Sequence, residues 1–411
     1  MKKVAVVIFL LNIFVYSPIL SHWGDISSIA IRVVQAISIA FGLLNADYSN
    51  SVLKKLSGYL FLIFLLNTIS EFFHRETDVA AIFRLLIHCL YVISLFGILP
   101  NISENIFKKG FLFLLLTNVG WFLLYIREYN PDFSLLKSGS VEGVASIKSA
   151  KGDIFESGFS LVSIHIFPLL LFILIPLYKK NQIFILILSF LVSICLLFSL
   201  TFTAILASIM TICGFLMMKY TRSFSSLIFK FFFIGYAALM LFLYLNDFFD
   251  LRTLTTGRST LWQVAIENIK DNLMFGVSLK DFYMMAIHWN APEISGGSCH
   301  NMYLSWLMNH GILSFCVYLN LIVFYWNQTV KKAPVYILPF LYILIRGTHE
   351  ATGFIDFSDG IIEFLIDIFW YLLSQIDINH AENSCSSCLA YNPSNMVCHA
   401  KTYRLDERSW V

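Results

Sequence analysis

Long apolar runs are the feature that most constrains the fold of this chain. A helix needs about 20 mostly apolar residues to cross a bilayer, and such runs recur along nearly all of the 411 residues. This repetition excludes a signal peptide on a soluble domain. Charged residues make up 13% of the chain, whereas a soluble globular chain has about 25%. We therefore predict an all-α integral membrane protein with about twelve transmembrane helices. The predicted spans are 4–20, 26–44, 57–72, 80–99, 110–126, 159–178, 182–198, 201–218, 227–245, 303–325, 335–347 and 360–378.

Lysine and arginine in the short loops predict the orientation, because cytoplasmic loops carry an excess of both. If the N-terminus is cytoplasmic, every inner loop has at least two cations, and the short outer loops have none or one. A miscounted span would invert every later loop and spoil this pattern. We therefore expect both termini to be cytoplasmic, in a bacterial inner membrane. The cations of the inner loops are Lys2 and Lys3, Lys54 and Lys55, Lys108 and Lys109, Lys179 and Lys180, Lys219 with Arg222 and Lys230, and Lys331 and Lys332.

The predicted organisation is one polytopic membrane domain, 1–378, followed by a cytoplasmic tail, 379–411. Two periplasmic loops are long, about 127–158 and about 246–302, and the second precedes the last three helices. Long loops are usually functional or disordered. In the second loop, Ser259 is a candidate helix cap, and apolar residues follow it at helical spacing. This pattern predicts an amphipathic helix that lies either on the outer membrane surface or on the helix bundle.

Four arginines fall at the level of the predicted outer leaflet. Arg32 and Arg84 lie inside apolar runs, Arg346 at the outer end of the eleventh span, and Arg258 in the long second loop. A charge at the bilayer centre costs roughly 2.5–3.5 kcal/mol on insertion scales. Each arginine alone is typical of a snorkelling or ion-paired side chain. Together they indicate an anion site, because guanidinium binds phosphate oxygens through two parallel hydrogen bonds.

The second loop and the helix after it contain an ordered set of motifs. From Thr256 the chain reads TGRSTLW, then NIKDNLMFGVSLKDFY, then CHNMYLSWLMNHGILSF. A Gly-Arg pair and a tryptophan are followed by an amphipathic helix, a glycine turn and a His-Asn pair that opens a transmembrane helix. This order resembles the core motif of the O-antigen polymerase and O-antigen ligase superfamily. The corresponding positions are Gly257, Arg258, Trp262, Gly276, His300, Asn301 and Gly311.

The resemblance implies a bilayer-embedded glycosyltransferase of lipopolysaccharide biosynthesis. Such enzymes take a glycan from undecaprenyl diphosphate in the outer leaflet. Polymerases join it to another lipid-linked repeat unit, and ligases join it to lipid A-core. The implied partners are the undecaprenyl-diphosphate-linked glycan, the lipid bilayer, and a chain-length regulator and flippase of the same pathway. We expect no nucleic acid partner, no cofactor and no metal.

In members of this family, arginines hold the diphosphate and a histidine is the proposed base. Fixed guanidinium groups stabilise the negative charge of the leaving diphosphate without a metal, and a neutral histidine with a pKa near roughly 6.5 suits proton removal from the acceptor hydroxyl. We therefore predict His300 as the catalytic base, with His310 as the weaker candidate. The predicted diphosphate-binding residues are Arg258, Arg346, Arg84 and Arg32, and the supporting residues are Gly257, Trp262 and Asn301.

Each of these assignments has an alternative interpretation. His300 without its surrounding motif would be a helix-start histidine at the membrane interface, and Asn301 either caps that helix or orients the acceptor, with capping favoured. The sequence also departs from the family pattern. Phe202 stands where many members carry an arginine, and Ser278 replaces a second glycine. The missing arginine favours an O-antigen polymerase over a ligase. A flippase or transporter is a further alternative, disfavoured because the inner halves of the spans lack a polar path.

Overall fold

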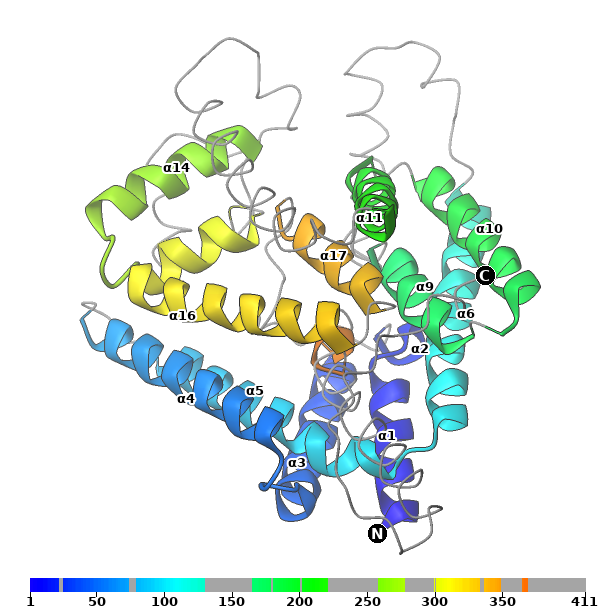
Figure 1. Ribbon diagram of the computed structural model, residues 1–411, viewed down its shortest axis with the longest axis horizontal. Helices are drawn as coiled ribbons and strands as arrows, with labels where there is room; N and C mark the ends of the chain where they lie inside the picture. The colour runs from blue at the N-terminus through cyan, green and yellow to red at the C-terminus, as the bar shows by residue number, and fades with distance from the viewer. Residues whose placement is uncertain are drawn as a thin grey trace, which may run out of the picture. The chain divides into compact units, whose positions relative to one another are not determined.

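The computed structural model describes residues 1–21, 25–73, 79–129, 165–178, 180–199, 202–220, 258–277, 299, 301–332, 336–348 and 364–368. Within these ranges every regular element is helical, and no strand occurs (Figure 1). All of them belong to one compact unit, Met1–Ser374, and the second unit, Gln375–Val411, lies outside the described residues. The helices are α1 (Lys2–Val15), α2 (Pro18–Ser21), α3 (Asp25–Asn45), α4 (Ser51–Phe72), α5 (Val79–Ile98), η1 (Leu99–Asn101), α6 (Glu104–Tyr129), α9 (Ile166–Leu177), α10 (Gln182–Ser199), α11 (Phe202–Tyr220), α14 (Arg258–Asp271), α16 (Met302–Lys332) and α17 (Ile337–Arg346).

Several of these helices have the length and composition of membrane spans. In the part of the chain that the structure describes, five are long and apolar enough to cross a bilayer, and four shorter apolar helices coincide with further predicted spans. The prediction of a helical membrane protein is confirmed. The number of twelve spans stays a prediction, because 227–245 and most of 360–378 lie outside the described residues. The five long candidates are Ile26–Asn45, Ser51–Phe72, Ile82–Asn101, Glu104–Leu124 and Met302–Thr329.

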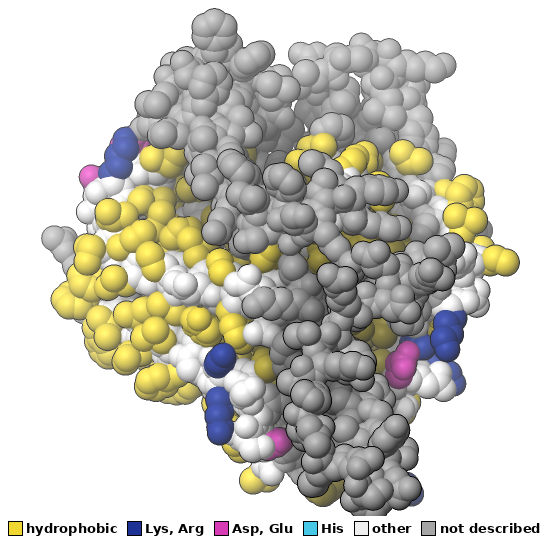
Figure 2. Space-filling model, viewed as in Figure 1, with side chains coloured by type: hydrophobic (Ala, Val, Ile, Leu, Met, Phe, Trp, Pro, Cys, Tyr) yellow, Lys and Arg dark blue, Asp and Glu magenta, His cyan; other side chains and the backbone are white. Residues whose placement is uncertain are grey.

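Large apolar side chains cover much of the described surface (Figure 2). On α10, for example, Ile183 is 75% exposed, Leu186 71% and Phe190 68%. Extensive exposed apolar surface marks a face that contacts a membrane or another protein. If lipid surrounds these helices, their apolar side chains need not be buried inside the protein.

Contacts between individual residues define the relative directions of the helices. Ser314 of α16 donates a hydrogen bond to Asn67 of α4 at 2.6 Å, while Lys55 lies 5.7 Å from the ring centroid of Phe324. Later residues of α16 therefore meet earlier residues of α4, so the two helices run antiparallel. Pairs of aromatic and cation–aromatic contacts show the same for α6 and α9. These directions agree with the predicted alternation of spans, although they do not distinguish the two sides of the membrane.

The first predicted span, 4–20, is not one helix. Helix α1 ends at Val15, and α2 begins at Pro18. Proline disfavours the helical conformation of the residue before it and has no N–H to donate. The hydroxyl of Ser17 donates instead to the carbonyl of Phe14 at 2.7 Å, which satisfies part of the freed backbone.

The tenth predicted span, 303–325, is also not a straight helix. Gly311 has φ 73° and ψ 176° inside α16, and the rings of Trp306 and Tyr318 stack with centroids 4.2 Å apart. Residues twelve apart in a straight helix are separated by about 18 Å. The helix therefore bends sharply at Gly311, and its two arms lie against each other (Figure 1). We call 302–310 the first arm and 312–332 the second arm.

Helices α3 and α5 touch through their backbones. A methyl group on Gly97 would overlap the carbonyl oxygen of Gly42, and one on Gly42 would overlap the backbone of Ser94. Small residues at such crossings allow close van der Waals packing, which drives helix association in lipid.

We predict that Gly97→Ala destabilises the folded protein by about 1–3 kcal/mol, because the added methyl group overpacks the α3–α5 crossing. The melting temperature of the detergent-solubilised protein measures this loss. Gly120→Ala is the matched control, since a methyl group there meets no atom within 4 Å. An equal melting temperature for the two variants would contradict the close crossing.

Candidate functional site

The start of α16 is fixed by Asn301. Its side-chain oxygen accepts hydrogen bonds from the backbone N–H groups of Tyr303 and Leu304, both at 3.1 Å. This is the geometry of a helix N-cap. Its amide nitrogen donates to the carbonyl of Thr348 at 3.2 Å, and the side chain is fully buried. Asn301 therefore has the capping role, and it also ties α16 to the residues that follow α17.

The end of α17 docks on this helix start through the backbone. The N–H of Met302 donates to the carbonyl of Gly347 at 2.7 Å, and the hydroxyl of Tyr303 donates to the carbonyl of Leu344 at 3.0 Å. A side chain at position 347 would lie 2.6 Å from the end of the Met302 side chain. Arg346 is the neighbour of Gly347 and is only 1% exposed. The contact thus brings the end of α17, which carries the buried Arg346, to the segment that begins α16.

Helix α14 reaches the same segment from another direction. Trp262 and Ala265 are buried against Cys299 and Met308 in one apolar cluster. Because Cys299 directly precedes position 300, this packing places the first turns of α14 beside the start of α16. Arg258 begins the helix about one turn before Trp262. We call the meeting point of α14, the first arm and the end of α17 the α16 junction.

Most of the predicted site residues belong to segments that meet at the junction. It brings together the segments that carry Arg258, His300 and Arg346. The side chain of Arg258 and the whole of Gly257 and His300 lie outside the described residues. The amphipathic helix predicted after Ser259 packs on the bundle through its apolar face. It begins at Arg258, so Ser259 is its second residue and not its cap.

Arg32 and Arg84 lie on another pair of helices, α3 and α5, which pack against each other. Both side chains are exposed. Arg32 donates a hydrogen bond of 3.4 Å to the side-chain oxygen of Gln35, whose amide donates to the hydroxyl of Tyr16 at 3.0 Å. The contact with Gln35 gives Arg32 a structural role on α3. Diphosphate binding by Arg32 and Arg84 stays a prediction.

Two glycines of the sequence motif face each other in space. Gly276, after α14, has φ 72°, and Gly311, at the bend of α16, has φ 73°. Glycine is the residue that adopts this left-handed region without steric cost. A methyl group on Gly276 would lie 2.6 Å from the backbone of Asn309, and one on Gly311 would overlap the carbonyl of Met274. Each glycine is needed both for its backbone angles and for the space that it leaves.

Backbone hydrogen bonds join the two glycine segments. Val277 donates to the carbonyl of Met308 at 2.7 Å, and Ile312 donates to the carbonyl of Leu273 at 2.8 Å. A sharp bend frees helical N–H and C=O groups, which must find new partners when they are buried. The turn after α14 provides such partners. We call this pair of segments, 272–277 and 308–312, the glycine clasp.

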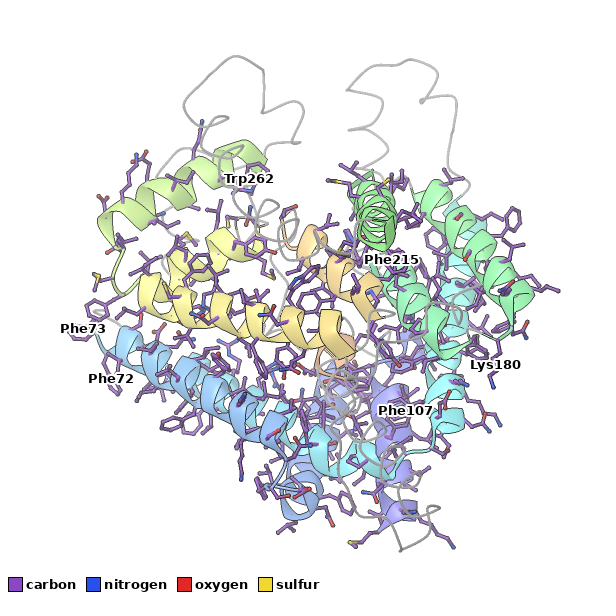
Figure 3. All side chains as sticks on the ribbon, viewed as in Figure 1. Phe72, Phe73, Phe107, Lys180, Phe215 and Trp262 are labelled. Atoms are coloured by element: carbon purple, nitrogen blue, oxygen red, sulfur yellow. The ribbon has the colours of Figure 1, made fainter. Side chains whose placement is uncertain are left out.

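The end of α4 supports the clasp from a third side. The hydroxyl of Ser70 donates to the carbonyl of Phe275, and the rings of Phe73 and Phe275 stack at 4.2 Å. One turn earlier, Asn67 accepts the hydrogen bond from Ser314 of the second arm. Figure 3 shows Phe73 at the end of α4, close to the turn that follows α14. The clasp is therefore held by α4, α14 and α16 together.

The groups around the junction are mostly buried. Cys299 is fully buried, its sulfur lies 3.0 Å from the hydroxyl oxygen of Ser305, and burial raises its thiol pKa to about 11. A thiol with so high a pKa is a poor nucleophile. His310 is also buried, with its ring 4.8 Å from that of Trp306 and one residue before the bend. Both residues thus have a packing role here.

Sequence reasoning did not identify the support from α4. Asn67, Ser70 and Glu71 are all buried. They recur at helical spacing within an apolar span, so they form a polar stripe on one face of α4. This polar stripe is the sequence feature that could have predicted a contact on this face of α4. The pairing of Gly276 with Gly311 had no comparable signal, since 34 residues separate them in the chain.

We predict that Gly311→Ala destabilises the protein by more than about 2 kcal/mol, because a left-handed residue with a side chain costs roughly 1–2 kcal/mol before any clash. Gly276→Ala should have a similar effect. Because both substitutions disrupt the contact between the same two segments, the double variant should lose less than the sum of the two. Melting temperatures measure all three variants.

Gly214→Ala is the control for the clasp variants, since a methyl group there makes only an ordinary contact of 3.7 Å with Leu341. Strict additivity of the two clasp substitutions would show that the glycines act independently.

A comparison with protein-family models identifies part of the chain. Residues 184–319 match a protein-family model described as O-antigen ligase. These residues are about a third of the chain and include most of α10, all of α11 and α14, the glycine clasp, Trp262 and Asn301. Arg346, Arg32 and Arg84 lie outside the matched region. No curated protein matches the chain. The match to residues 184–319 confirms the resemblance predicted from the motifs and is consistent with the O-antigen polymerase and O-antigen ligase superfamily.

Proposed function

We propose that the chain is an O-antigen polymerase that joins undecaprenyl-diphosphate-linked oligosaccharide repeat units at the periplasmic face of the inner membrane. One observation carries the proposal. The α16 junction gathers three segments that are far apart in the sequence, and each carries a predicted site residue. They are the start of α14 with Arg258, the start of α16 with His300, and the end of α17 with Arg346.

The proposed reaction is a displacement at the first carbon of the donor glycan. A hydroxyl of the acceptor repeat unit attacks this carbon while the bond to the diphosphate oxygen breaks. His300 accepts the hydroxyl proton, and undecaprenyl diphosphate leaves with the bonding electrons. Arg258 and Arg346 stabilise the charge that develops on the diphosphate. No step in this scheme requires a metal ion.

The burial of Arg346 supports this assignment. Electrostatic interactions are stronger where water is excluded, and donors fixed before reaction need no rearrangement when charge develops. Arg346 is held at the end of α17 by the backbone contacts between Gly347 and Met302. A buried cation on an anchored backbone is suited to an anionic leaving group.

An O-antigen ligase that transfers the glycan to lipid A-core is the second candidate. The matching family model is described as O-antigen ligase, and the match supports either activity. The residue at the start of α11 favours polymerase, because Phe202 stands where the ligase pattern has an arginine. Both candidates use the same donor and the same junction, so the acceptor distinguishes them.

We predict that His300→Ala abolishes polymer formation at normal abundance of the protein in the membrane, since it removes the proton acceptor. Arg258→Ala should also abolish activity. Arg258→Lys should lose most of it, because lysine keeps the charge but not the bidentate fork. Polymer made by purified enzyme from lipid-linked repeat units is the measurement.

Lys270→Ala is the matched control on the same helix. Lys270 is an exposed cation that pairs with Glu267 at 2.7 Å, so its loss should leave activity unchanged. Normal polymer from both His300→Ala and Arg258→Ala would remove the basis for the assigned site.

The lipopolysaccharide of a deletion strain should separate the two candidate functions. We expect the strain to keep a single repeat unit on lipid A-core, because the ligase of the cell still acts. Gel electrophoresis of the lipopolysaccharide measures this directly. Complete loss of repeat units from the core, restored by the wild-type protein, would instead assign the ligase activity.

A further inference from the structure

Trp262 has a buried polar group that meets no partner among the described residues. Its side chain is only 8% exposed, and its indole N–H meets no hydrogen-bond acceptor in the described part of the chain. Buried tryptophan N–H groups usually find a partner, and an indole can only donate. The indole of Trp306 shows the usual arrangement, since it donates to the hydroxyl of Ser314 at 3.3 Å.

Packing alone does not explain a tryptophan at this position. Its neighbours in the cluster, such as Val264, Ala265, Cys299 and Met308, offer apolar side chains. A phenylalanine would supply an aromatic ring without a donor that must be desolvated and left unsatisfied. The nitrogen therefore weakens the free protein. A bound ligand that accepts a hydrogen bond from this N–H would explain why tryptophan occupies the position despite the cost of burying the donor.

The position of Trp262 indicates which ligand accepts a hydrogen bond from its indole. Trp262 belongs to the same buried apolar cluster as Cys299, the residue before His300, and follows Arg258 by about one turn of α14. Figure 3 shows it at the end of α14 that begins with Arg258. The unsatisfied donor thus belongs to the α16 junction, where the proposed reaction takes place.

We propose that the indole N–H of Trp262 donates a hydrogen bond to an oxygen atom of the lipid-linked substrate. This proposal rests on the proposed function and adds a substrate-binding residue to the junction. The acceptor is a sugar oxygen or a diphosphate oxygen, since both present lone pairs to a donor. A diphosphate oxygen is negatively charged and would accept the stronger bond.

Trp262→Phe tests this proposal, because it removes the N–H and keeps an aromatic ring. The melting temperature of the purified variant should equal or exceed that of the wild type. Its affinity should fall about tenfold or more, as expected for the loss of one hydrogen bond to the ligand. Two probes distinguish the source of the oxygen. If Trp262→Phe binds undecaprenyl diphosphate more weakly, the acceptor is a diphosphate oxygen. If only the binding of the glycan-bearing lipid is weaker, the acceptor is a sugar oxygen.

Trp306→Phe is the matched control. Its N–H already has a protein partner, so this variant should melt at a lower temperature, whereas Trp262→Phe should not. Unchanged binding of both probes by Trp262→Phe would overturn the proposal. A fall in the melting temperature of Trp262→Phe like that of Trp306→Phe would also overturn it, because the indole would then be a packing group. Failure of the proposed function is separate, because wild-type protein would then make no polymer from repeat units.

Discussion

The contact between the segments of Gly276 and Gly311, the glycine clasp, organises the part of the molecule that concerns function. Both glycines adopt backbone angles that other residues avoid, and each leaves the space that the other segment fills. The bend at Gly311 frees backbone groups of α16, and the turn after α14 satisfies them through two hydrogen bonds. Without this exchange the bend would bury unpaired N–H and C=O groups, which is costly at a membrane. The first arm of α16 could then not fold back on the second.

The α16 junction depends on that bend. Because the first arm turns back, the start of α16 meets the end of α17 and the apolar face of α14. Asn301 and Gly347 complete the contact through hydrogen bonds and close approach. In a straight span, position 300 would lie beyond the second arm and away from Arg346. The geometry of the proposed active site is therefore a consequence of two glycines that take no part in chemistry.

The family match and the contacts between the helices indicate the same region as the functional site. The family match covers α14, the clasp and the first arm, whereas Arg346 lies beyond it and is connected to the region only by the docking of α17. The indole of Trp262 gives this region a buried donor that no described residue accepts from. A buried cation on the helix end that docks at the start of α16, and a buried donor in the cluster beside that start, are consistent with an oxygen-rich anionic substrate.

Apolar runs and charge spacing in the sequence determined that the chain is a helical membrane protein, because the length needed to cross a bilayer is a property of local composition. The motifs also determined which residues to examine. The sequence did not reveal that 4–20 breaks at Pro18 or that 303–325 bends at Gly311, since both depend on how freed backbone groups are satisfied. Only the tertiary structure decided that Arg346 joins the segments of Arg258 and His300, while Arg32 and Arg84 lie on α3 and α5. Residues at one level of a membrane share a depth, but helix packing alone decides which of them meet.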